Sequence, residues 1–387
     1  MKSPRSLVPA SGVLALVFLV TAGPAPAAAP STTVVMSGLD NPRGLAMAPD
    51  GTLYVAEAGK GGPGHCAVGA ESRPVCEGRT GAVSRLRHGV QRRIVSGLPS
   101  HAVQDPASEA GNGAIGPHDV SVQGEALYVT IGLGGGPAFR DALGHDFGWL
   151  IRVDEERRRW RKVADITGYE FENNPDNGVP DSNPYGLLGP TGRRVLTDAG
   201  GNSLLRVSGD GDISTLATFP SRAQGRPTDA VPTCVTVGPD GAYYVGELTG
   251  VPFATGAARV YRVVPGEEPE VFLEGFTTII DLAFGPDRSL YVLQHSSAGP
   301  FFAGPGLSSA WLLTARARRS WTGSRGRHPS CSRPVARTMT TMATTMRGAR
   351  RMRRGTANRT ESASCSTSRI GAPAPRWERS SASSPDF

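Results

Sequence analysis

Residues 38–59 read GLDNPRGLAMAPDGTLYVAEAG, and this stretch decides the fold. Two short runs with alternating apolar residues flank a Pro-Asp-Gly turn at 49–51. Side chains alternate between the two faces of a strand, so Leu45 and Met47 share one face, and the second run alternates in the same way. Proline sets φ, aspartate caps the backbone, and glycine accepts left-handed geometry in tight turns. The stretch predicts a β-hairpin, which is marginal alone in water and needs neighbouring strands.

The same phrase returns along the chain. Three further copies and one weaker copy lie at 116–130, 231–247, 279–293 and, the weaker one, 185–199. A third strand-like run follows four of the five copies, at 81–86, 149–153, 203–207 and 258–263, commonly with a fourth at 91–96, 213–217 and 270–273. Four strands in a repeat of about 45 residues are typical of a propeller blade. We therefore predict an all-β fold, a β-propeller of four-stranded blades. An open β-sandwich is the alternative.

Three insertions lengthen the first repeats. Residues 58–80, 101–115 and 167–184 are rich in glycine, proline, asparagine and aspartate and have little periodicity. We expect these loops to lie on one rim of the propeller, where such folds build their binding surfaces.

Several uncommon phrases occur in a fixed order. The opening stretch is followed by GPHDV, SNPYG and DAGGNSLLRV. In these phrases, over about residues 34–306, the chain resembles the ScyD/ScyE family of exported propeller proteins. The resemblance implies a propeller of about six blades and export, but no catalytic residues, because the family has no agreed catalytic set.

The first 29 residues have the pattern of a signal peptide. Lys2 and Arg5 precede an apolar core at 14–20, and Ala-Pro-Ala at 25–27 fits a cleavage site. That core is shorter than the ~20 residues that span a bilayer. We expect the mature protein to be secreted or associated with the cell envelope, without a membrane span after cleavage. Retention as an uncleaved anchor is the alternative.

Cysteine usage fits an oxidising compartment. Cys66 and Cys76 lie in one insertion and are close enough to form a disulfide, which would stabilise by roughly 2–3 kcal/mol. A zinc site would add His65, but a third protein ligand and a C-x-x-C knuckle are absent. We favour the disulfide. Cys234 stands at an apolar strand position and is expected to be buried.

The net charge of +7 conceals two regions of opposite sign. Residues 307–387 contain 16 arginines, no lysine and 3 acidic residues, so the preceding 306 residues carry −6. The repeat region is acidic, and we expect no nucleic-acid partner. We divide the chain into a signal peptide (1–29), a propeller domain (30–306) and a disordered basic tail (307–387), because the tail is poor in apolar residues.

The tail begins where the repeat still requires a strand. A GC-rich back-translation of residues 306–321, read in a shifted frame, yields A-L-L-R-V-A-P-D-G-T-R-T-E-L, which is a strand, a turn and the start of a further strand. We therefore interpret the tail as the product of a frameshift near Gly306. The chain then supplies about five of six blades, the fifth incomplete.

Strong catalytic motifs are absent: the sequence has no H-E-x-x-H, no G-x-S-x-G and no phosphate-binding glycine loop. Polar residues do recur beside the first two strands of the repeats. The carboxylates and amides are Glu57, Asp119, Asn183, Asp198, Asn202, Glu247 and Asp281, and the histidines are His118 and His295. If the blades pack radially, these residues meet at one rim of the central channel. The oxygens could then hold Ca²⁺, and the histidines could bind a softer metal or act as acid and base. Capping of turns is the structural alternative.

Two function classes follow. The first is a secreted, monomeric propeller that binds a small molecule or an extracellular partner through its rim loops and central channel, without turnover. The second is a metal-dependent hydrolase or lactonase of the propeller type. A third reading, a non-functional frameshifted allele, follows from the tail.

Overall fold

The protein was examined as a computed structural model, which describes residues 33–69, 72–104, 110–124, 126–189, 193–224, 226–295 and 313–315; at 222–224, 226, 227 and 313–315 it describes the backbone only. The signal peptide, the proposed frameshift position and residues 316–387 lie outside the described residues. Expectations about them stay predictions.

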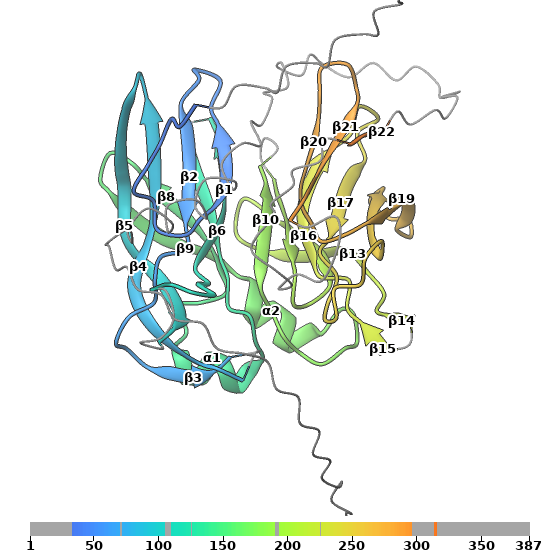
Figure 1. The fold of residues 1–387 in the computed structure, drawn as a ribbon, viewed down its shortest axis with the longest axis horizontal. Coiled ribbons are helices and arrows are strands. Elements are labelled where there is room, and N and C mark those ends of the chain that lie inside the picture. Colours follow the sequence, from blue (N-terminus) through green and yellow to red (C-terminus); the bar gives the residue numbers. More distant parts are fainter. Residues whose placement is uncertain are drawn as a thin grey trace, which may run out of the picture. The chain divides into compact units, whose positions relative to one another are not determined.

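The fold is all-β and built of antiparallel sheets in the order of a propeller, as predicted (Figure 1). The first sheet contains β1 (Pro42–Met47), β2 (Leu53–Glu57), β4 (Pro74–Arg87) and β5 (Val90–Val103), with β3 (Cys66–Val68) added to β4. The second contains β6 (Pro117–Gln123), β7 (Ala126–Ile131), β8 (Trp149–Asp154) and β9 (Arg159–Asp165). The third contains β10 (Pro184–Leu188), β11 (Arg194–Asp198), β12 (Ser203–Val207) and β13 (Ile213–Thr218).

Two further sheets follow. The fourth contains β16 (Pro232–Val237), β17 (Tyr243–Glu247), β18 (Ala258–Val263) and β19 (Glu270–Phe276). In its described part, the fifth contains β20 (Ile279–Phe284), β21 (Leu290–Gln294) and β22 (Leu313–Ala315). The short strand β22 pairs with β21 and comes from beyond residue 306, so the fifth sheet has three strands where the others have at least four.

The opening hairpin has the predicted register. Leu45 faces Val55 and Met47 faces Leu53. The Asp50 carboxylate accepts the amide of Thr52, and Gly51 has a φ of 83°, which favours glycine. Local turn chemistry thus sets the pairing of β1 and β2.

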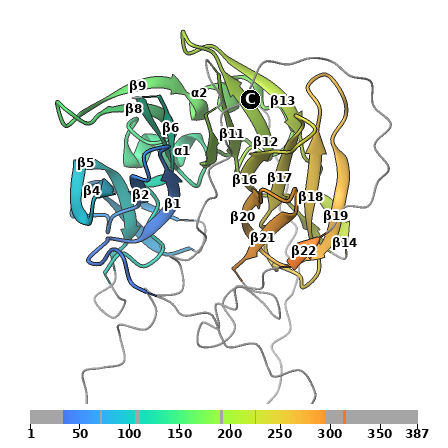
Figure 2. The ribbon, with the colours of Figure 1, turned by 90° about the horizontal axis from the view of Figure 1, so that it is seen from above.

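The first strand of each sheet lies beside the first strand of the next. These inner strands are β1, β6, β10, β16 and β20, which contact one another in that order. Figure 2 shows β1, β6, β16 and β20 on the sides of the sheets that face one another. Among the described strands, β20 and β1 make no comparable contact, so these two ends of the series are not joined to each other.

The core lies between successive sheets. One residue of each second strand is buried at the same register position: Val55, Val129, Leu196, Val245 and Val292. In the first interface, Val83 and Val95 pack in one cluster with Val129 and Ile151 of the second sheet. The alternation that predicts the strands therefore also supplies the apolar faces between blades.

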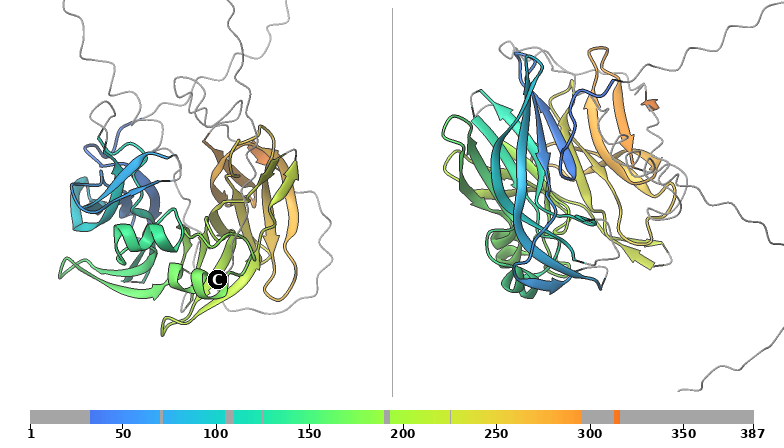
Figure 3. Two further views of the ribbon diagram at one scale, coloured as in Figure 1. Left: turned by 90° about the horizontal axis from the view of Figure 1, so that it is seen from below. Right: turned by 60° about the vertical axis from the view of Figure 1, so that its left-hand side comes forward.

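Connections between the strands, including the insertions at 58–80 and 167–184, carry additional elements toward the same end of the sheets (Figures 1 and 3). These are β3, α1 (Pro137–Leu143), α2 (Ile166–Asn173) and the hairpin of β14 (Arg222–Gln224) with β15 (Arg226–Thr228). Gly135, which lies before α1, and Ser182 of the insertion at 167–184 form a β-bridge. Cys66 and Cys76 form a disulfide between β3 and β4, and Cys234 is buried in β16. In the described part of the chain no helix is long and apolar enough to cross a membrane.

Candidate functional site

The structure does not bring the nine predicted polar residues to one place. Two of them, and Gln294 at the equivalent position, hold the segment that precedes the inner strand of their own blade. Three register-equivalent side chains accept such an amide: Glu57 from Asp40 at 2.7 Å, Asp198 from Asn183 at 2.6 Å and Gln294 from Thr277 at 2.6 Å. A repeated position therefore has a repeated structural task.

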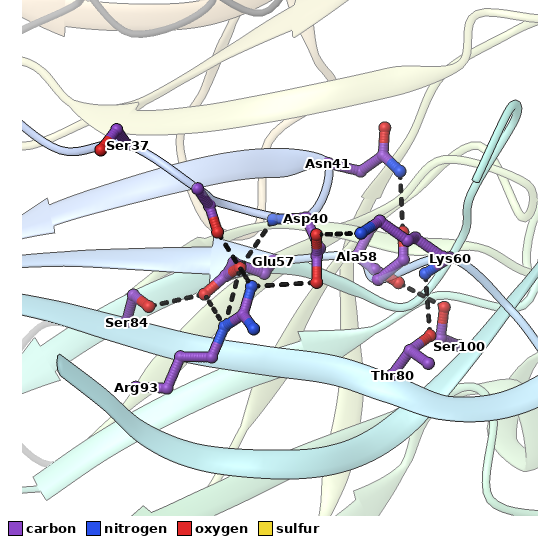
Figure 4. Close-up of polar contacts among 12 residues, drawn as sticks. Ser37, Asp40, Asn41, Glu57, Ala58, Lys60, Thr80, Ser84, Arg93 and Ser100 are labelled. Carbon is purple, nitrogen blue, oxygen red and sulfur yellow. Dashed lines mark hydrogen bonds and ion pairs between the residues drawn. The ribbon is translucent and has the colours of Figure 1, made fainter. Parts of the chain in front are cut away.

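Glu57 shows why this position is a poor metal ligand. It is fully buried, and its carboxylate accepts from Ser84 at 2.6 Å and pairs with Arg93 at 2.6 Å (Figure 4). The hydrogen bonds that Arg93 donates to Glu57 are the main cause that raises the pKa of Arg93, and Asp40 also contributes. The oxygens of Glu57 are thus occupied by Ser84, Arg93 and the amide of Asp40, and its role as a metal ligand stays a prediction.

Asp198 is equally engaged. Its carboxylate accepts the hydroxyl of Ser182 at 2.6 Å and the amides of Asn183, Gly200 and Gly201. Burial raises the pKa of Asp198, and these four hydrogen bonds oppose that rise.

Four other predicted residues also contact backbone. The Glu247 carboxylate accepts the amide of Arg259 at 3.0 Å, and that of Asp281 accepts the amide of Leu282 at 2.8 Å. The side-chain oxygen of Asn183 accepts the backbone amide of Leu133, and that of Asn202 accepts the backbone amide of Val231. These contacts fit capping.

Asp119 joins two blades. Its carboxylate accepts the amide of Val120 at 2.8 Å and, from the next inner strand, the amide of Leu187 at 2.8 Å. A Cβ atom on Gly44 of the preceding inner strand would collide with the Asp119 carboxylate, so glycine is required there. Asp119 therefore lies between three consecutive inner strands.

A second set of side chains belongs to the second residue of each inner strand. At this residue the pairing of the inner strand with the next strand of its sheet shifts register. We call them the axial residues: Arg43, His118, Tyr185, Thr233 and Ile280. His118 Nδ1 lies 2.9 Å from the Pro184 carbonyl oxygen, and its ring lies 4.4 Å from the Tyr185 ring between centroids. A carbonyl only accepts, so Nδ1 carries the proton and Nε2 is the acceptor of the neutral ring.

Arg43 dominates the electrostatics of this region. Its Nη2 donates to the Ala114 carbonyl at 2.9 Å, whereas its Nε is buried and has no hydrogen-bond partner. Burial lowers the pKa of His118 to about 3, and the charge of Arg43 adds to the effect. The same two causes lower the pKa of His295. Burial raises the pKa of Tyr185, and Arg43 opposes that rise.

The axial region can therefore bind an anion more readily than a metal ion. A guanidinium with an unused N–H stands beside neutral imidazole and phenol groups, and its positive charge disfavours a divalent cation at His118 or His295. In the described residues no group of three or more histidine, cysteine, aspartate or glutamate side chains has the geometry of a metal site.

The sequence analysis missed Arg43 and Tyr185. A signal was present, because proline precedes the axial residue in four of the five repeats, as in N-P-R-G and N-P-Y-G. Aligning the repeats on that proline places Arg43, His118, Tyr185 and Thr233 at one equivalent position. Glu170 and Asp181, near the third blade, were also missed because they lie in an insertion without repeat register.

No family model matches the chain, and no curated protein matches its sequence. Among solved structures, it is similar to a catalytically inactive virginiamycin B lyase from Staphylococcus aureus with quinupristin (14% identity, TM-score 0.38, 67% of this chain and 66% of that one). It is also similar to the periplasmic gluconolactonase of Pseudomonas aeruginosa (16% identity, TM-score 0.39, 66% of this chain and 79% of that one). A third similar structure is the PQQ-bound aldose sugar dehydrogenase of Streptomyces coelicolor (16% identity, TM-score 0.32, 71% of this chain and 94% of that one). The match spans slightly less than two thirds of the lyase chains. The chain is therefore characterised by its own architecture, an all-β protein built of propeller blades.

Proposed function

We propose that this protein is an exported propeller that binds a small carboxylate-bearing molecule at the axial residues, without chemical turnover. The observation that carries the proposal is the buried Nε–H of Arg43, which has no hydrogen-bond partner. Buried polar groups in folded proteins are normally satisfied, and an unsatisfied donor on a charged group marks a place for a ligand.

The chemistry of Arg43 favours a carboxylate. A guanidinium binds a carboxylate through two parallel N–H bonds, and the Ala114 carbonyl holds Nη2 at 2.9 Å and so limits the rotation of the group. His118 lies beside it in neutral form with Nε2 as an acceptor, so a hydroxyl on the ligand would find a partner there. Hydroxy acids are therefore the ligand class that we favour.

The metal-dependent hydrolase or lactonase remains the second candidate. It would require a cation near His118 and His295, where Arg43 already places a positive charge. For this reason binding without turnover is the better-supported function.

Export and the ScyD/ScyE relationship belong to the same proposal. Both rest on the sequence: the segment with Ala-Pro-Ala at 25–27 and the repeated phrases of the blades. N-terminal sequencing of the protein recovered from the culture medium tests export, and a mature chain that begins between Ala28 and Pro30 is the expected result. Recovery of the uncleaved chain from the membrane fraction would contradict it.

Isothermal titration with acetate, tartrate, gluconate and citrate tests the binding proposal. We expect the hydroxy acids to bind, and Arg43→Gln to lose at least tenfold in affinity, because a hydrogen bond to a charged group is worth about 1.5–3 kcal/mol. The matched control is Arg152→Gln, which removes an exposed arginine of β8 and should bind as the parent does. Mass spectrometry of the recovered ligand should show it unchanged.

Two outcomes would overturn the proposal. One is the absence of binding by any of the four acids at millimolar concentration. The other is equal affinity in the parent and in an Arg43→Gln variant with unchanged circular dichroism. Hydrolysis of added lactones that is lost on metal chelation would support the second candidate instead.

A further inference from the structure

Acidic side chains from four separate segments gather at the insertion end of the third blade. We call them the acidic cluster: Glu170 of α2, Asp176 and Asp181 between α2 and β10, Asp198 at the end of β11, and Asp229 before β16. A Cβ atom on Gly200 would lie 2.6 Å from Asp181 Oδ1, and one on Gly201 would collide with Glu170 Oε2. The two glycines after β11 thus let both carboxylates approach the same turn.

Glu170 is the unusual member of the acidic cluster. It is 0% exposed, and neither of its carboxylate oxygens has a hydrogen-bond partner. Its carboxylate packs against Gly201, directly beside the Asp198 turn. A carboxylate removed from water without a partner is strongly unfavourable, so this side chain points to a missing cation or proton.

The surroundings of Glu170 are consistently negative. Burial is the main cause that raises its pKa to about 8, and Asp198, Asp176 and Asp181 raise it further. Burial likewise raises the pKa of Asp181 to about 7, with Asp198, Asp229 and Asp176 adding to the shift. Among the described side chains, no lysine or arginine forms an ion pair with these carboxylates.

Further oxygen atoms border the acidic cluster. Asn174, one helical turn after Glu170, has a buried Oδ1 without a hydrogen-bond partner. The backbone N–H of Asn174 donates to the Glu170 backbone carbonyl at 2.7 Å. Asn202 donates to Asp176 at 2.9 Å.

The scaffold around Glu170 is rigidly connected. Thr167 of α2 donates to Ser182 at 2.8 Å, and Ser182 donates to Asp198 at 2.6 Å. This chain of hydrogen bonds fixes α2 to the end of β11, so Glu170 is held where it is by packing and not by a polar partner of its own.

We propose that the acidic cluster binds a hard divalent cation, Ca²⁺ in the first place, with Glu170 and Asp181 as the principal ligands. Ca²⁺ accepts six to eight oxygens in flexible geometry, whereas Mg²⁺ demands a tight octahedron. Asp181 and Glu170 contact the adjacent residues Gly200 and Gly201, but no three of the described carboxylates have the geometry of a metal site, so the cation would have to draw Glu170 and Asp181 together. It then ties the loop after α2 to the turn after β11, two segments of the insertion rim.

Calcium binding to the full chain, stripped with EDTA and dialysed, provides the test. We expect one equivalent of Ca²⁺ by titration calorimetry and by plasma metal analysis, and a higher thermal midpoint with Ca²⁺ present. Glu170→Gln and Asp181→Asn should each weaken Ca²⁺ at least tenfold. Asp210→Asn, at an exposed aspartate in the β12–β13 turn, is the matched control and should leave affinity unchanged. Asp181 is only half-buried, so its variant stays informative if Glu170→Gln fails to fold.

Three results would overturn the proposal. They are no uptake of Ca²⁺ at millimolar concentration, equal Ca²⁺ affinity in the parent and the folded Asp181→Asn variant, or tighter binding of Mg²⁺ or spermidine than of Ca²⁺. The outcome is independent of the axial site, because Arg43→Gln should lose carboxylate binding and retain Ca²⁺.

Discussion

The Nδ1 atom of His118 lies 2.9 Å from the carbonyl oxygen of Pro184, the residue that begins the inner strand of the next sheet. Thr233, at the equivalent position two blades later, donates to the carbonyl of Ile279 at 2.7 Å. Pro184 and Ile279 are themselves equivalent, so one side chain in each of these blades binds the first carbonyl of the following blade. His118 and Thr233 therefore link neighbouring blades, and His118 also borders the proposed anion site.

Removing the Thr233 hydroxyl tests this link. We expect Thr233→Val to lower the free energy of unfolding by about 1–3 kcal/mol, because the buried Ile279 carbonyl loses its partner. Thr236→Val, at a half-buried threonine of the same strand, is the control and should change stability by less than about 0.5 kcal/mol. Equal losses in urea denaturation would contradict the inter-blade role.

Glu57 should matter for folding and not for ligand binding. Glu57→Ala removes a buried carboxylate that binds Ser84 and the partly exposed Arg93, and leaving the buried Ser84 hydroxyl without this partner costs about 1–3 kcal/mol. Denaturant unfolding measures the change. Glu156→Gln, at an exposed glutamate, should be nearly neutral. A well-folded Glu57→Ala protein with parental stability would show that the pair is unimportant.

Two buried histidines should contribute less stability in mild acid, whereas Glu170 and Asp181, whose pKa values are raised, act in the opposite sense. Burial lowers the pKa of His101 to about 4 and, together with Arg43, that of His118 to about 3. Below the unfolded pKa of about 6.5 a histidine of the unfolded chain binds a proton that the native state does not, so the stability that each histidine contributes decreases as the pH falls from 6.5 toward 4.

The limiting contribution is about 1.4 kcal/mol per pH unit for each histidine. His118→Gln should make the decline between pH 7 and pH 5 shallower when unfolding is followed at both pH values. An unchanged slope in that variant would mean that His118 titrates normally.

The disulfide should stabilise the first blade. Replacing Cys66 and Cys76 with serine should lower the free energy of unfolding by about 2–3 kcal/mol, since the cross-link restricts the unfolded chain. Reductant should destabilise the parent by a similar amount and leave the double variant unaffected. A parent that is insensitive to reductant under denaturing conditions would contradict this prediction.

The chain should gain stability if its reading frame is repaired. The inner strands β20 and β1 make no extended contact among the described residues, whereas each earlier inner strand packs on the next. A gene continued after Gly306 with A-L-L-R-V-A-P-D-G-T-R-T-E-L should yield a protein with a higher thermal midpoint, because the added strands complete the fifth sheet and cover its strand edge.

DNA sequencing across the codons for residues 300–311 is the direct check of the frameshift. A base gained or lost relative to that frame is the expected result. Stop codons in the alternative frame would refute the frameshift.

The strands themselves were predictable from local chemistry. The Pro-Asp-Gly turn at 49–51 and the alternating apolar residues predict the pairing of Leu45 with Val55, and the recurrence of that phrase predicts one blade after another. Alternation and turn chemistry act over a few residues, so they can be read from the sequence and carry over to every repeat.

The contacts of the candidate site residues depend on how one blade packs against the next, which the sequence does not show. The sequence predicted that Glu57 and Asp119 would share one rim, but Glu57 binds Arg93 inside its own blade, and Asp119 binds Leu187 of the next one. The direction of a side chain beside a register shift follows from the pairing of strands. Its partners follow from the packing of one sheet on another.

The sequence by itself determined the all-β repeat, its strands and its turns, because these depend on neighbours along the chain. The tertiary structure alone decided that Arg43 stands beside His118 and His295, and that Glu170 is buried against Gly201 without a hydrogen-bond partner. These residues are far apart in sequence and share no local pattern. Burial and charge become properties of a site only after the blades have packed together.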